Sequence, residues 1–183
     1  MKKVSWIFAL LAALMVVFVG CTEANASFDA ESYLASAVAY PGAIISTFNS
    51  TDCEATIGGN GVITVNGSAG YKNLFTIGFP GNSGPGTGNI PAGATNVVID
   101  YVCVIDSGTM KITTKQGFNG VGFISGTGDK DLNPVQYNYL FKAGVGQLKI
   151  PAAYFDTYKN GVSFENGNSA QAWRIKILNV SFE

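Results

Sequence analysis

The chain contains no histidine, and this one feature excludes several common kinds of active site. Ser-His-Asp triads, Cys-His dyads and histidine-ligated zinc all need an imidazole. Glycosidase chemistry stays open, because it uses two carboxyl groups about 5–9 Å apart. However, the acidic residues of the chain stand in no catalytic pattern, and we expect solvated carboxylates at strand ends and in loops: Asp100, Asp106, Asp129, Asp131, Asp156 and Glu165. The sequence therefore predicts a protein that is not an enzyme.

Residues 129–133 (DKDLN) have the alternating oxygen ligands of a calcium-binding loop. An EF-hand would continue with glycine at position 134 and glutamate at position 140, where this chain has Pro134 and Leu140. The segment is therefore not an EF-hand, and a polar turn is the alternative to a structural Ca²⁺ site. No other cofactor is expected. The candidate calcium ligands are Asp129, Asp131 and Asn133.

The first twenty residues have the pattern of an export signal. Lys2 and Lys3 precede an uncharged, almost wholly apolar run at 4–19. At 16 residues this run is shorter than the ~18–20 residues that a membrane-spanning helix needs. A basic start, an apolar run and a boundary of small residues are typical of a signal peptide. We assign residues 1–20 to it and expect no other segment to cross a membrane.

Two cleavage sites are possible at the end of this signal. The sequence FVGC, ending at Cys21, resembles a bacterial lipobox, although Phe18 replaces the usual leucine. Cys21 would then be acylated, and 21–27 would tether a domain at 28–183 to the cell envelope by its lipid anchor alone. The alternative is cleavage after Ala26, at an A-x-A boundary, which would release a secreted protein without Cys21.

The charge of the chain argues against a nucleic-acid partner. The net charge is −1, and only 13% of the residues are charged. A nucleic-acid-binding protein normally carries a basic patch or a high isoelectric point. Aromatic residues make up 12% of the chain, and this combination favours a neutral, polar partner.

Cys53 and Cys103 are the two cysteines that follow Cys21. In an oxidising compartment they could form a disulfide. The bridge would close a loop of about 50 residues and contribute about 4 kcal/mol. The alternative is a pair of buried thiols that act as small hydrophobic residues, which the apolar run at 97–105 favours for Cys103. Both alternatives stay open.

Short apolar runs separated by glycine-rich turns predict an all-β domain. At 73–79 the pattern alternates, so we expect Phe75, Ile77 and Phe79 to face the core. The run at 96–105 is apolar on both faces apart from Asp100, which is typical of a central strand. Expected strands lie at 43–48, 62–65, 73–79, 96–105, 110–118, 135–142, 147–150 and 173–182, with a helix within 28–39.

The last expected strand changes its alternation part-way. Ile175 and Ile177 share one parity, whereas Val180 and Phe182 have the other. A β-bulge near residues 178–179 would return both pairs to the core. With about eight short strands and no internal repeat, we predict a two-sheet antiparallel β-sandwich of the jelly-roll kind.

Two segments near the C-terminus resemble a known family. Residues 148–155 (LKIPAAYF) are similar to the segment that precedes the closing strands of jelly-roll carbohydrate-binding modules, of the galactose-binding-like β-sandwich type. Residues 173–182 (WRIKILNVSF) resemble the final strand of these modules. The resemblance implies a β-sandwich and a non-catalytic role in binding a polysaccharide or other glycan.

A glycan site needs aromatic platforms for the apolar faces of sugars and planar polar groups for their hydroxyls. For each aromatic residue the alternative is a place in the core. The alternative function is a structural or adhesive envelope protein that contacts other envelope proteins. The expected ligand-binding residues are Tyr71, Tyr101, Tyr137, Tyr139 and Trp173 as platforms, with Gln116 and Arg174 as hydrogen-bonding partners.

Overall fold

The fold is taken from a computed structural model, which describes seven stretches of the chain. They are residues 28–45, 55–66, 72–108, 110–113, 139–155, 159–166 and 172–183. Within these stretches no helix is both long enough and apolar enough to cross a membrane. The expected signal peptide and tether lie outside them.

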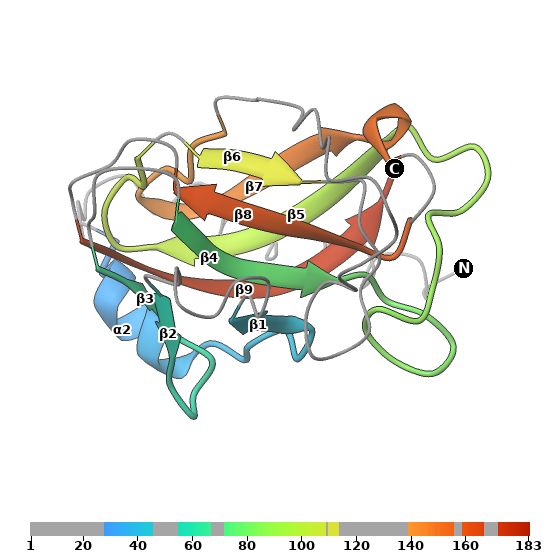
Figure 1. The fold of residues 1–183 in the computed structure, drawn as a ribbon. Coiled ribbons are helices and arrows are strands. Elements are labelled where there is room, and N and C mark those ends of the chain that lie inside the picture. Colours follow the sequence, from blue (N-terminus) through green and yellow to red (C-terminus); the bar gives the residue numbers. More distant parts are fainter. Residues whose placement is uncertain are drawn as a thin grey trace, which may run out of the picture.

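Two antiparallel sheets pack face to face (Figure 1). The four-stranded sheet has the order β1 (Ala43–Ile45), β4 (Lys72–Gly78), β8 (Gly161–Asn166) and β6 (Met110–Thr113). The five-stranded sheet has the order β2 (Ala55–Ile57), β3 (Ile63–Val65), β9 (Trp173–Phe182), β5 (Asn96–Cys103) and β7 (Gly144–Pro151). From β4 to β9 the chain changes sheet at every step, as in a jelly roll. The predicted β-sandwich is confirmed.

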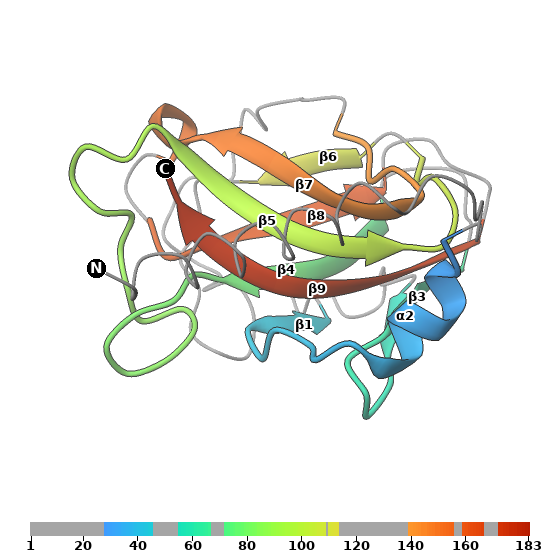
Figure 2. The ribbon, with the colours of Figure 1, turned by 180° about the vertical axis from the view of Figure 1, so that it is seen from behind.

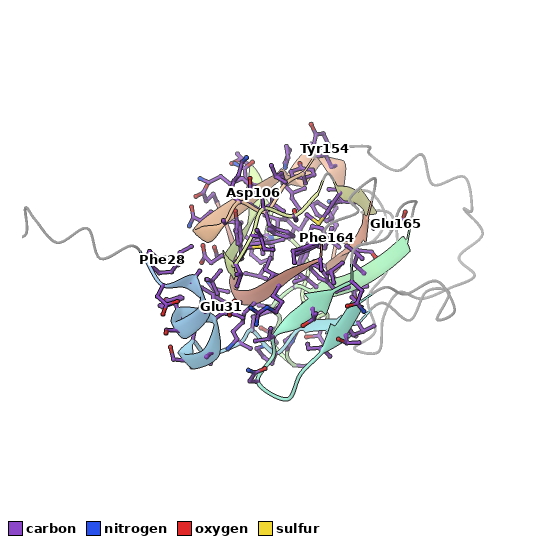
Figure 3. All side chains as sticks on the ribbon, turned by 90° about the vertical axis from the view of Figure 1, so that its left-hand side faces the viewer. Phe28, Glu31, Asp106, Tyr154, Phe164 and Glu165 are labelled. Atoms are coloured by element: carbon purple, nitrogen blue, oxygen red, sulfur yellow. The ribbon has the colours of Figure 1, made fainter. Side chains whose placement is uncertain are left out.

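Aromatic side chains fill the space between the sheets. The ring of Phe75 stacks on Phe164 with centroids 4.9 Å apart, and Phe141 lies 4.8 Å from Tyr101. Figure 3 shows Phe164 in the interior, whereas the next residue, Glu165, lies at the outer side. Alternation along each strand thus separates the core from the solvent face. As predicted, β4 and the residue after it bury Phe75, Ile77 and Phe79 completely.

The predicted bulge in β9 is also confirmed. Asp100 pairs with Asn179 and Tyr101 pairs with Ile177, so Leu178 has no partner on β5. Because of this extra residue, Ile177 and Val180 both face the core and are buried. Consequently the outward-facing residues of β9 have even numbers before the bulge and odd numbers after it.

Four strands differ from expectation. A side chain at Gly146 would lie 2.6 Å from the Tyr101 hydroxyl, so glycine interrupts the apolar pattern there, and the strand expected at 147–150 in fact begins at Gly144. β2 and β8 were not predicted, although the alternation of Val162 and Phe164 with polar residues in β8 is clear. The expected strand at 135–142 is wrong where it is described, since Tyr139 forms only an isolated bridge with Met110.

Helix α2 (Ala30–Ser36) is shorter than the expected helix. Asp29 caps it by accepting hydrogen bonds from the backbone N–H groups of Glu31 and Ser32, at 3.1 and 3.2 Å, and from the Ser32 hydroxyl. These bonds, of which the one from the Ser32 hydroxyl has the largest effect, lower the pKa of Asp29. The helix buries Leu34 and lies beside β3 and the start of β9 (Figure 2). A 3₁₀ turn, η2 (Ala152–Tyr154), follows β7.

Candidate functional site

A groove lies between helix α2 and the hairpin formed by β2 and β3. It has two adjoining compartments with volumes of about 510 and 370 Å³. Ala35, Ile57, Gly58 and Asn60 line both compartments. We call this feature the α2–hairpin groove. Its size is in the range that small ligands occupy in proteins.

The two walls of the groove meet at Gly61. One wall is the end of α2 with residues 37–41, and the other includes the hairpin turn at 58–61. Gly61 has φ +77°, and a Cβ atom there would lie 2.2 Å from the Cβ of Ala39. Only glycine combines this backbone conformation with this close approach. The glycine therefore sets how closely the hairpin approaches the opposite wall.

Asn60 stands at the tip of the hairpin in a fixed orientation. Its Oδ1 accepts a hydrogen bond of 3.2 Å from the Val62 N–H. The turn beneath it is closed by the Gly61 N–H, which donates to the Gly58 carbonyl at 2.8 Å. Within the described part of the chain the Asn60 side-chain nitrogen has no acceptor. An oriented amide with unused donors is therefore available to a ligand.

Arg174 is one of the residues that line the smaller compartment. Arg174 forms an ion pair with Glu31 of α2 through a single contact between Nη2 and Oε1, and both side chains are about half exposed. An exposed pair of this kind contributes at most about 1 kcal/mol. Figure 3 shows Glu31 on the helix. Thr64 pairs with Arg174 across β3 and β9, and it lines the same compartment.

The larger compartment is lined by Lys176, which is only 1% exposed. Its Nζ donates a hydrogen bond of 2.8 Å to the carbonyl of Ala37, just after the end of α2. Burial lowers the pKa of Lys176. An ammonium group has three donors, and among the described residues only this carbonyl accepts from it. The groove thus contains a buried cation without a described counter-ion.

This environment predicts that the lysine charge reduces stability. Since its folded pKa is below the ordinary value of 10.5, the unfolded chain binds more protons just below pH 10.5, and stability rises with pH there. Lys176→Met should therefore raise the free energy of unfolding by about 1 kcal/mol at pH 7. The gain over wild type should shrink towards pH 10.5.

Urea unfolding of both proteins between pH 7 and 10.5 measures this difference. Among the described residues that line the groove, the other ionisable groups are Arg174 on β9, Glu31 on α2 and Tyr40 in the neighbouring segment, and all three are present in both proteins. Tyr40 donates to the Gly78 carbonyl at 2.5 Å, and burial raises its pKa to about 12. A gain that stays constant across the pH range would contradict the interpretation.

Among the expected ligand-binding residues that the structure describes, only Arg174 lies in the groove. Tyr101 and Trp173 are 3% and 2% exposed and pack between the sheets. Both therefore belong to the core, which was the alternative to a role as a sugar platform. Buried rings have no free face for a sugar, so both leave the expected set. Tyr139 is partly buried against the core and is also outside the groove. The expected residues outside the described ranges are Cys21, Tyr71, Gln116 and Tyr137, with the calcium candidates Asp129, Asp131 and Asn133.

Cys103 is a free, buried thiol, and Cys53 lies outside the described residues. The Cys103 Sγ donates to the Ile105 carbonyl at 2.9 Å. Burial raises the pKa of this thiol to about 12. In the structure Cys103 is therefore a buried thiol, which is the second of the two alternatives for this residue.

Cys103 is expected to resist alkylation in the folded protein, because the reactive form of a thiol is the thiolate. In non-reducing urea it should react fully with iodoacetamide. Mass spectrometry of the peptide that contains Cys103, prepared from folded and unfolded protein, measures both states. Full protection in urea that is lifted only by a reductant would show a disulfide instead.

A second polar surface lies further along the outer face of the five-stranded sheet. The side-chain nitrogens of Gln147 and Asn179 donate to the two carboxylate oxygens of Asp100, at 2.8 and 3.2 Å. These three side chains form a row across β7, β5 and β9. Both Asp100 oxygens already accept hydrogen bonds, and the row lines neither compartment of the groove. The groove is therefore the stronger candidate.

The chain matches no model of a known protein family, and no curated protein is significantly similar to it. The resemblance of its C-terminal segments to carbohydrate-binding modules thus supports a proposal about function and no assignment to a family.

Proposed function

We propose that this protein is an exported, lipid-anchored, non-catalytic carbohydrate-binding protein that captures or adheres to a polysaccharide. The α2–hairpin groove is its binding site. The proposal rests on one observation above all: a concave groove on the outer face of the sandwich presents an oriented amide, a guanidinium and threonine hydroxyls together. Planar donors of this kind suit the paired hydroxyls of sugars.

The lining of the groove also supports contact with sugar C–H groups. Ile57 is partly exposed along the hairpin wall, and Tyr40 lines the larger compartment. Tyr40 keeps its hydroxyl engaged with the Gly78 carbonyl, so its ring is held in place. Apolar contact of this type complements the hydrogen bonds of the amide and guanidinium.

A non-catalytic role agrees with the acidic residues that line the groove. Glu31 is the only carboxylate in the described lining, and it is paired with Arg174. Hydrolysis by the usual mechanism needs a second carboxyl group about 5–9 Å away. Binding without bond cleavage is therefore the activity proposed for this groove.

Binding of the purified mature domain to a panel of soluble and insoluble polysaccharides, with and without calcium, tests the proposal. We expect saturable binding to one polysaccharide class and no release of reducing sugar. Calcium dependence would support the candidate ligands Asp129, Asp131 and Asn133. Absence of binding across the panel would contradict the proposal.

A structural or adhesive role is the second candidate, and exposed apolar side chains near the N-terminal end of the domain favour it. The rings of Phe28 and Tyr33 lie 5.6 Å apart and are both exposed, and Val38 is more exposed still. Such a surface suits contact with another envelope protein. In this case the double variant Phe28→Ser, Tyr33→Ser should no longer capture that protein. Neither the variant nor the wild-type protein should bind a polysaccharide.

A further inference from the structure

We infer that the α2–hairpin groove selects saccharides that carry carboxylates, with Lys176 and Arg174 as its two cationic contacts. The inference rests on the proposed function and narrows the class of polysaccharide to acidic ones. It follows from the charges in the groove, the burial of Lys176 and the state of Arg174.

The described lining of the groove carries an excess of positive charge. Arg174 and Lys176 are two residues apart on β9, before its bulge, so both side chains lie on the same outer face. Glu31 is the only anion that lines either compartment. Pairing Glu31 with Arg174 leaves the charge of Lys176 uncompensated. An anionic ligand would supply the missing counter-charge.

The surroundings of Lys176 should make the groove prefer an anionic ligand to a neutral one. The side chain is 1% exposed, and its one described acceptor, the Ala37 carbonyl, is neutral. A ligand hydroxyl would offer the ammonium another neutral acceptor. A carboxylate that reached the ammonium as residues 37–41 moved aside would form a charge-assisted hydrogen bond in a place from which water is largely excluded, where such a bond is strongest. The groove should therefore discriminate between an acid and a neutral sugar of the same shape.

Arg174, in the smaller compartment, already binds one carboxylate, that of Glu31. The contact with Glu31 uses one nitrogen of the guanidinium. A guanidinium has five N–H donors, so four have no partner in the described part of the chain. A ligand carboxylate can bind this side chain beside Glu31 or in its place. Lys176 and Arg174 thus provide two cationic contacts along one groove.

The test compares a galacturonate oligosaccharide with its fully methyl-esterified form, in which each carboxylate is replaced by a neutral and slightly larger ester group. Isothermal titration with the mature protein at low salt should give at least about tenfold tighter binding of the acid. Lys176→Met should remove this preference, and Arg174→Gln should reduce it. Lys149→Met is the control, because Lys149 is an exposed cation on the same sheet that pairs with Glu183 outside the groove. Circular dichroism confirms that each variant is folded.

The outcomes separate the inference from the proposed function. Equal binding of acid and ester, or binding only to a neutral polysaccharide of the panel, would overturn the inference and leave the proposed function standing. A preference for the acid that survives Lys176→Met but is lost in Lys149→Met would place the acidic site elsewhere and also overturn the inference. Absence of binding to any saccharide would contradict both.

Discussion

Replacing Phe75 with alanine is expected to lower the free energy of unfolding by about 4 kcal/mol. Phe75 is fully buried, and its ring contacts three other core rings, those of Phe141, Phe164 and Trp173. Removing it leaves a cavity between the two sheets that these side chains can fill only in part. Because a domain of this size is stable by only about 5–15 kcal/mol, the variant should unfold at a much lower urea concentration.

Phe28→Ala is the matched control for this experiment. The same side chain is lost there, but Phe28 is 52% exposed, so we expect a change of about 0.5 kcal/mol. Urea unfolding followed by fluorescence measures both variants. Similar losses of stability in the two variants would contradict the core described above.

Gly61→Ala is expected to damage the groove directly. The substitution places a side chain on a backbone with φ +77° and 2.2 Å from the Cβ of Ala39. Strain and overpacking together should lower the free energy of unfolding by about 2 kcal/mol. The hairpin must also move away from residues 37–41, which separates Asn60 from Lys176. Saccharide binding should therefore fall by at least about tenfold, or 1.4 kcal/mol.

Gly59→Ala provides the control, since Gly59 lies in the same turn and a Cβ atom there meets nothing within 4 Å. This variant should keep its stability, and its binding should fall much less than that of Gly61→Ala. Unfolding and titration of the two variants, measured side by side, give the comparison. Normal binding by Gly61→Ala would show that the ligand does not depend on the approach of the two walls.

Much of the sandwich could be predicted from the sequence, because alternation reports which face of a strand is buried. The parity change between Ile177 and Val180 predicted the bulge in β9, and the structure has it. The early start of β7 depended on a residue far away in the sequence. Gly146 interrupts the apolar pattern where Tyr101 from β5 fills the space above it, and no local pattern reveals such a partner.

The site was predicted less completely. Alternation places Trp173 on the same face as Ile175 and Ile177, so its position in the core could have been inferred from the sequence. The same reasoning places Arg174 and Lys176 together on the outer face, yet only Arg174 was among the expected ligand-binding residues. The burial of Lys176 follows from the path of residues 37–41 over β9. Contacts this distant in sequence depend on tertiary structure and leave no local signal.

The most direct test of carbohydrate binding in the α2–hairpin groove is to map the bound saccharide by NMR. Amide chemical shifts of the labelled mature protein would be followed during titration with a galacturonate oligosaccharide, and then with a neutral oligosaccharide. We expect the largest shifts at Asn60, Arg174 and Lys176, with little change at Gln147 and Asn179. Shifts concentrated on the Gln147–Asp100–Asn179 row, or saturable binding that leaves the groove amides unchanged, would contradict carbohydrate binding in the groove.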